Sequence, residues 1–197
     1  MLVKLKLALA ACVLAAGGAH AADPVASGLP GGYSFSEYSG AAAVGAGLVD
    51  TSNQVFFIDE KTVAGIKSWY IFFDPAHVQS LTATITFDTP IVSVLDTKPA
   101  LDGSNATYGI DVDGDGVFDD YATSLLIAPE PRDSTTWSVG GNTVTLDWLT
   151  ADPGDHIRVL TQAPAVPEPE TWALLAAGLA ALSWRGRRHG ARRSARG

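Results

Sequence analysis

Apolar and polar residues alternate with a period of two along much of the central part of the chain. Every second residue is apolar between residues 80 and 87, and the same pattern recurs at 143–148 and 156–159. This period predicts strands with one face in a core and the other in water, so His156 and Arg158 are expected on a wet face. Further β-rich runs cover residues 33–38, 54–59, 68–74, 91–95 and 121–128.

One of these runs, residues 69–73, is apolar at every position. Such a run predicts a central strand that is covered on both faces. Glycine and proline turn signals separate the runs, and no helical pattern is evident between residues 22 and 165. About eight short strands with this punctuation predict an all-β fold, a single antiparallel β-sandwich over residues 22–162.

The two ends of the chain have a different composition. Lys4 and Lys6 precede an apolar stretch at 7–16 and the sequence Ala19-His20-Ala21, which predicts a signal peptide at 1–21. Residues 9–12 also resemble a lipobox that would leave a lipidated Cys12 first, but this alternative has a very short apolar region.

At the other end, a proline-rich linker at 163–171 precedes an apolar stretch at 172–184 and a tail at 185–197 that contains six arginines. The apolar stretch predicts a short transmembrane helix, marginal against the ~20 residues that a bilayer core requires. The arginines would keep the tail in the cytoplasm and the rest of the protein outside.

Residues 166–188 resemble the PEP-CTERM sorting signal of bacterial surface proteins, because the proline-rich motif, the apolar segment and the arginines occur in that order. The resemblance implies that Pro167, Glu168 and Pro169 are read by an exosortase-type enzyme. It also implies transient anchoring at the membrane, followed by release to the cell surface or extracellular matrix. The same region is also catalogued as an "ice-binding protein C-terminal domain", a name that implies nothing about ice here. The alternative is an ordinary C-terminal membrane anchor.

The net charge of the central part of the chain limits the molecules that it can bind. Residues 22–165 contain five basic and nineteen acidic side chains, a formal balance of −14, which argues against nucleic-acid binding. The only cysteine, Cys12, lies in the predicted signal peptide, so the mature chain would have no disulfide.

Residues 111–120 have the spacing of a calcium-binding loop. Carboxylates stand at loop positions 1, 3, 5 and 9 and glycine at position 6, and the backbone carbonyl of position 7 would add a ligand. The predicted Ca²⁺ ligands are Asp111, Asp113, Asp115, Val117 and Asp119. Position 12, where a bidentate acid is expected, is Ala122, so the site is predicted to be weak, with Asp120 or water as the substitute. We expect the loop to lie between strands without flanking helices; the alternative is a solvated acidic turn.

Catalytic patterns are missing from the sequence. His77 and His156 stand alone, and no nucleophile or phosphate-binding motif occurs. Trp69, Trp137 and Trp148 are predicted to lie in the core, although an exposed row of them would bind sugars. The sequence therefore predicts a non-enzymatic exported protein of the cell surface or biofilm matrix. The alternatives are a carbohydrate-binding module for exopolysaccharide and, third, a polysaccharide hydrolase with two convergent carboxylates.

Overall fold

The structure is a computed structural model that describes residues 20–122, 128–165, 175 and 177–179. Most of the predicted signal peptide, the Pro-Glu-Pro tripeptide at 167–169 and most of the predicted transmembrane helix lie outside the described residues. Residues Ala21–Pro164 form one compact unit, and the two ends of the chain belong to a second. Among the described residues, no helix has the length and apolar composition that crossing a membrane requires.

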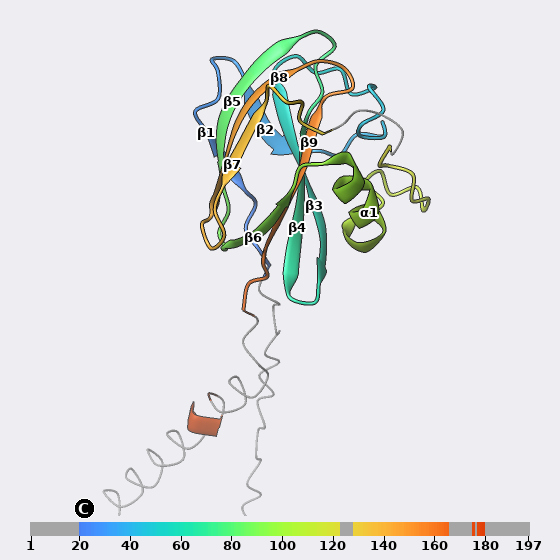
Figure 1. The fold of residues 1–197 in the computed structure, drawn as a ribbon. Coiled ribbons are helices and arrows are strands. Elements are labelled where there is room, and N and C mark those ends of the chain that lie inside the picture. Colours follow the sequence, from blue (N-terminus) through green and yellow to red (C-terminus); the bar gives the residue numbers. More distant parts are fainter. Residues whose placement is uncertain (1–19, 123–127, 166–174, 176, 180–197) are drawn as a thin grey trace, which may run out of the picture. The chain divides into compact units, whose positions relative to one another are not determined.

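In its described residues, the unit Ala21–Pro164 contains two β-sheets and one helix (Figure 1). The elements are β1 (Val25–Ser27), β2 (Ser34–Glu37), β3 (Gln54–Val63), β4 (Ile66–Phe73), β5 (Gln79–Thr86), β6 (Ile91–Leu95), α1 (Lys98–Tyr108), β7 (Ser134–Trp137), β8 (Thr143–Thr150) and β9 (Asp155–Gln162). One sheet has the order β1-β5-β8-β7, and the other has the order β2-β3-β4-β9-β6. The fold is therefore mostly β, as the sequence predicts.

The expectation of purely antiparallel sheets is wrong at one edge. Strand β2 pairs with β3 in parallel, from Ser34 opposite Gln54 to Glu37 opposite Phe57. Parallel neighbours need a crossover rather than a hairpin. Residues 38–53, which include the Ala/Gly-rich residues 40–47, provide that connection.

The first core is made of side chains from both sheets. The alternating residues of β5 and β8 point into it, as predicted, and meet apolar residues of the five-stranded sheet. Its buried members are Ala21, Val55, Phe57, Trp69, Ile71, Phe73, Leu81, Ala83, Ile85, Phe87, Ile91, Val94, Val144, Leu146, Trp148, Ile157 and Val159. Residues of β4 that point to this side therefore lose their contact with water entirely.

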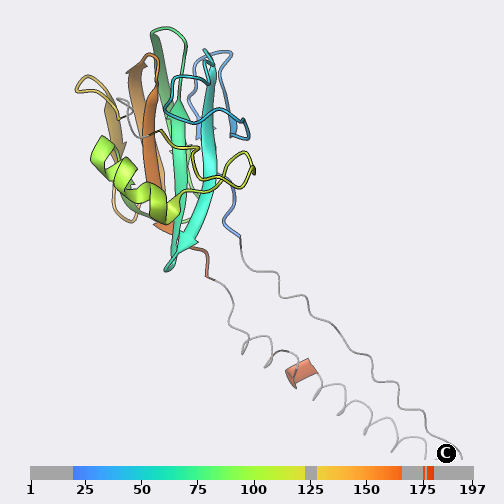
Figure 2. The same ribbon diagram turned by 90° about the vertical axis from the view of Figure 1, so that its right-hand side faces the viewer.

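The second core lies on the opposite face of the five-stranded sheet. Tyr70 and Phe72 of β4 pack there with Leu101 of α1, Tyr121 and residues of β3 and the β2–β3 connection. Figure 2 shows α1 and the loops after it across this face. Because both faces of β4 are covered, the predicted central strand is confirmed.

Helix α1 corrects the expectation that this region has no helix. Its sequence contains Gly103, Ser104 and Asn105, and its buried residues are Leu101 and Asn105 alone. A single apolar contact position cannot produce the i, i+3, i+4, i+7 pattern by which helices are recognised. Polar contacts, rather than an apolar stripe, hold this helix on the sheet.

The structure also corrects the prediction for strand β9, which is buried on both faces. His156 and Arg158 were expected in water, but neither has any exposed surface. They point into the second core beside Tyr70 and Phe72. The predicted run at 121–128 gives only an isolated bridge, between Tyr121 and Val44, within the residues that the structure describes.

Arg158 explains how α1 is attached. Its guanidinium forms a bidentate pair with Glu60 of β3, with both N–O distances at 2.7 Å. The remaining N–H groups donate to the Leu101 carbonyl at 3.0 Å, to the Ser104 hydroxyl and to Asn105 Oδ1 at 2.9 Å. All five guanidinium donors are thus satisfied. Two strands and the helix meet at this one side chain.

We predict that Glu60→Gln destabilises the protein by about 3–5 kcal/mol, because it leaves the buried Arg158 charge without a counter-charge. Urea unfolding of the purified chain measures this. Asp102→Asn serves as control, since it breaks a partly exposed ion pair with Lys98 on the same helix and should cost less than about 1 kcal/mol. Equal, small losses for both variants would contradict a structural role for the buried pair.

Candidate functional site: an acidic loop after helix α1

The predicted calcium loop follows α1 after only two residues, so the expectation that no helix flanks it is wrong on the entering side. Gly109 ends the helix, and its amide donates to the Asn105 carbonyl at 2.8 Å. A Cβ at Gly109 would lie 2.6 Å from the Phe118 ring, which explains why glycine is needed there. The helix end and the loop are therefore packed against each other.

Within the loop, aspartate side chains fold the backbone around themselves. Asp111 accepts the amides of Gly114 and Gly116 at 2.7 and 2.8 Å. Both glycines have positive φ, 75° and 89°, which other residues adopt only at a cost. Asp113 and Asp115 each accept the amide two residues further on, at 3.1 and 2.7 Å. These bonds curl the chain so that alternate carboxylates converge.

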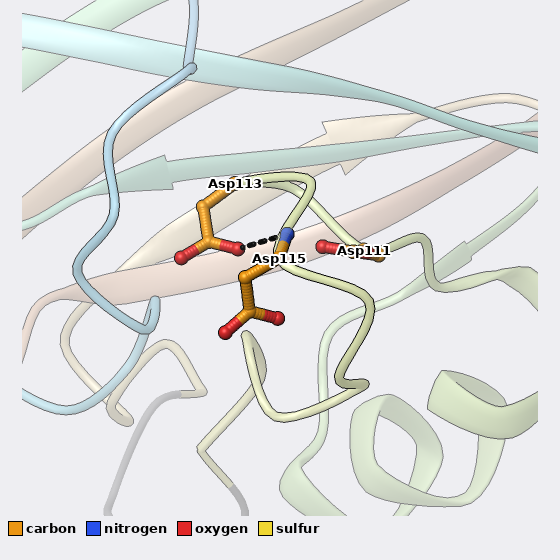
Figure 3. A group of neighbouring side chains, drawn as sticks. All are labelled: Asp111, Asp113 and Asp115. Carbon is orange, nitrogen blue, oxygen red and sulfur yellow. Dashed lines mark hydrogen bonds between the residues drawn. The ribbon is translucent and has the colours of Figure 1, made fainter.

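The convergence involves three of the four predicted carboxylates. Asp111, Asp113 and Asp115 each offer an oxygen within 4.8 Å of the others (Figure 3). Asp119 is exposed and lies outside this group. Val117 is exposed as well, and its amide donates to the Asp115 carboxylate. Three carboxylates at this spacing are a set of hard oxygen ligands that suits Ca²⁺.

Asp120, the predicted substitute for the missing acid, and Ala122, which occupies position 12, both form hydrogen bonds within the fold. Asp120 is buried, and its Oδ2 accepts the Val112 amide at 2.8 Å. Burial raises the pKa of Asp120, and the charges of Asp113, Asp111 and Asp119 raise it further. Ala122 donates its amide to the Val44 carbonyl at 3.0 Å and has no carboxylate to offer. The hydrogen bond between Val112 and Asp120 thus joins the start and the end of the loop.

Phe118 connects the loop to the rest of the structure. Its ring stacks on Tyr121 with centroids 5.8 Å apart, and Lys61 of β3 lies 5.7 Å from its centroid. Tyr121 in turn contacts Tyr70 edge-on at 5.2 Å, and the Arg158 guanidinium lies over both tyrosine rings. The acidic loop and the buried ion pair therefore share one aromatic cluster.

The three tryptophans do not form an exposed row. Trp69 and Trp148 have 0% and 1% of their surface exposed, and Trp137 is partly buried against the first core. The indole N–H of Trp148 donates to Thr135 at 3.0 Å. The core interpretation is confirmed for Trp69 and Trp148, and a sugar-binding row of these residues is ruled out.

Titratable groups with shifted pKa values are buried in other parts of the unit. Burial lowers the pKa of His156 to about 4, and its ring stacks on Phe72 at 5.3 Å. Burial also raises the pKa of Asp74 to about 6 and that of Asp155 to about 7. Desolvation is the largest cause of each shift, as expected for groups inside a core. His77 is exposed.

The fold and the loop define a mostly β protein with a compact acidic loop, and the comparison with known families adds the C-terminal end. The family model of the PEP-CTERM protein-sorting motif matches residues 165–188. The chain thus carries a PEP-CTERM sorting motif, which confirms the predicted resemblance and supports export and sorting by an exosortase. No curated protein and no solved structure matches the chain.

We predict that Trp148→Ala costs about 3–5 kcal/mol of stability, because it removes a buried aromatic ring and its hydrogen bond. Trp137→Ala, at a partly buried position of the same sheet, should cost clearly less. Thermal unfolding of the purified chains measures both. A Trp148→Ala protein as stable as the unmodified one would contradict the core assignment.

Proposed function

We propose that the chain is a non-enzymatic protein of the cell surface or biofilm matrix, exported and sorted through its PEP-CTERM motif. The match at residues 165–188 is the observation that carries the proposal. An exosortase-type enzyme reads Pro167, Glu168 and Pro169 while the apolar segment 172–184 holds the protein in the membrane. The folded part is a two-layer β-sandwich that remains outside the cell.

The first described residues fit removal of a signal peptide before Ala22. The Ala22 nitrogen donates to the Asp88 carboxylate at 2.9 Å. After cleavage this nitrogen is an α-ammonium group, so the same contact becomes an exposed ion pair of modest strength. The preceding Ala21 is buried against the first core and is lost on cleavage.

We propose further that one Ca²⁺ ion stabilises the loop through Asp111, Asp113, Asp115, Asp119 and the Val117 carbonyl. Support comes from the three convergent carboxylates and from the side-chain hydrogen bonds that shape the turns around them. Repulsion among these charges opposes folding, and a bound cation would relieve it. With no carboxylate at Ala122, the affinity belongs at the weak end for extracellular modules, about 10⁻⁴–10⁻³ M.

Replacement of Pro167, Glu168 and Pro169 with alanines should leave the protein folded but unprocessed and retained in the inner membrane. The reason is that the tripeptide lies outside the compact unit Ala21–Pro164 and acts only as a recognition sequence. Cell fractionation and the electrophoretic size of the protein measure the result.

The chain supplies its own control, because a second Pro-Glu-Pro sequence occurs at residues 129–131. The copy at 129–131 lacks the apolar segment and the arginines that follow 167–169, and the family match does not include it. Alanines at 129–131 should leave sorting unchanged. Normal release and size of the 167–169 variant would contradict the sorting proposal.

Calcium should raise the melting temperature of the purified chain. Removal with EDTA should lower it, and millimolar Ca²⁺ should restore it more than equal Mg²⁺, which requires stricter octahedral geometry. A ligand that binds only the folded state stabilises by about 2.7 kcal/mol at a hundredfold excess over its dissociation constant. Differential scanning calorimetry in each condition measures the shift.

Asp113→Ala together with Asp115→Ala should abolish the calcium response. The matched control is Asp23→Ala with Asp147→Ala, which removes the same charge from exposed positions outside the loop. This control should retain the response. Identical melting curves of the unmodified chain with and without calcium would reduce the loop to an acidic turn.

A further inference from the structure

The outer face of the four-stranded sheet has an unusual composition. In β1, β5, β8 and β7, the residues that alternate with the core positions point away from the first core. These twelve residues are Val25, Ser27, Ser80, Thr82, Thr84, Thr86, Ser134, Thr136, Thr143, Thr145, Asp147 and Leu149. Nine of them carry a hydroxyl group, and we call this surface the hydroxyl face.

Strand register arranges the hydroxyls in rows across the sheet. Ser27 lies opposite Thr84, Thr84 opposite Thr145, and Thr145 opposite Thr136, so one row crosses all four strands. Thr86 opposite Thr143 starts a second row. Neighbouring strands are about 4.8 Å apart, and alternate residues of a strand about 6.8 Å apart. The face is therefore a regular grid of hydroxyls at the scale of sugar rings.

The threonine side chains of this grid have restricted rotamers before any ligand binds. Threonine is branched at Cβ, which restricts χ1 and reduces the entropy lost on binding. Thr84 and Thr145 are hydrogen-bonded to each other at 3.4 Å, and a hydroxyl can both donate and accept further bonds. The high β propensity of threonine accounts for its presence in strands, but not for the lack of charge on this face.

Charge distinguishes the hydroxyl face from the rest of the unit. Residues 22–165 carry nineteen acidic side chains, yet Asp147 is the only charged one among the twelve outward positions. Edge strands are usually protected by charged residues, and β1 and β7 are the edges of this sheet. The opposite sheet has no comparable surface, because α1 and its loops lie across its outer face (Figures 1 and 2).

We propose that the hydroxyl face is a binding surface for a neutral polysaccharide. The proposal rests on the matrix role proposed above and gives it a partner. A neutral sugar chain presents hydroxyls that can exchange hydrogen bonds with the grid, and it avoids the repulsion that the acidic unit exerts on polyanions. Each hydrogen bond to the sugar contributes little because it replaces a hydrogen bond to water. Affinity therefore comes from a long sugar chain that binds at repeated sites.

Affinity electrophoresis of the purified full chain tests this. Gels contain dextran or hydroxyethyl cellulose as neutral probes, or alginate as a polyanionic one, all with EDTA so that the acidic loop plays no part. The neutral polymers should retard the protein and alginate should not. Thr84→Val with Thr145→Val should weaken the retardation about tenfold, since valine keeps the branched shape and removes the hydroxyls.

Thr62→Val is the matched control, because Thr62 is exposed on β3, outside the hydroxyl face, and its variant should bind normally. Thr145→Lys gives a second, charged variant that should also lose binding, with melting curves to confirm folding. Failure of the neutral polymers to retard the unmodified chain, or equal retardation of the valine variant, would overturn the proposal. Self-association that the valine variant loses would overturn it too, by assigning the face to a second copy. None of these measurements depends on export or processing, so they stand apart from the sorting experiment.

Discussion

The fully buried ion pair between Arg158 and Glu60 is the constraint on which the second core, α1 and the acidic loop depend. A charge without solvent is tolerated only when it is paired and its donors are satisfied. Strand β3 supplies the counter-charge, and α1 supplies a carbonyl, a hydroxyl and an amide oxygen. Since Leu101 is the only apolar side chain that α1 buries, the position of the helix follows from this polar network more than from hydrophobic packing.

The position of the helix in turn fixes the acidic loop. The loop starts two residues after α1, and Ile110 and Val112 pack against the second core. Asp120 accepts a hydrogen bond from the Val112 amide and so joins the end of the loop to its start. Phe118 and Tyr121 continue the contact to the guanidinium. A cation bound at the loop would therefore act on a segment already coupled to the ion pair, and its binding energy would stabilise the helix and sheet together.

The sequence predicted the strands whose pattern of apolar residues shows which faces are buried. It did not predict the elements whose positions depend on specific buried polar contacts. Strands β5 and β8 were predictable because one face is core and the other water, and β4 because both faces are apolar. Strand β9 was misread because His156 and Arg158 are polar yet buried, and α1 because its contacts are polar. In the loop, the aspartate and glycine spacing predicted the convergence of Asp111, Asp113 and Asp115. The structural role of Asp120 depends on its burial and on the amide hydrogen bond that it accepts from Val112, which spacing alone does not reveal.

Burial also changes the charge that the unit presents to its surroundings. Two of the five basic residues in 22–165, Lys67 and Arg158, are buried, so Lys61, Lys98 and Arg132 are the bases left to offset the exposed acids. Four of the nineteen acids are buried as well, namely Glu60, Asp74, Asp120 and Asp155. The remaining fifteen acids and three bases give a balance of −12, so the surface is strongly acidic. Polyanions are repelled by such a surface unless divalent cations bridge them, whereas neutral polymers are not. The acidic loop and the uncharged hydroxyl face therefore suit different partners, a cation for one and a neutral chain for the other.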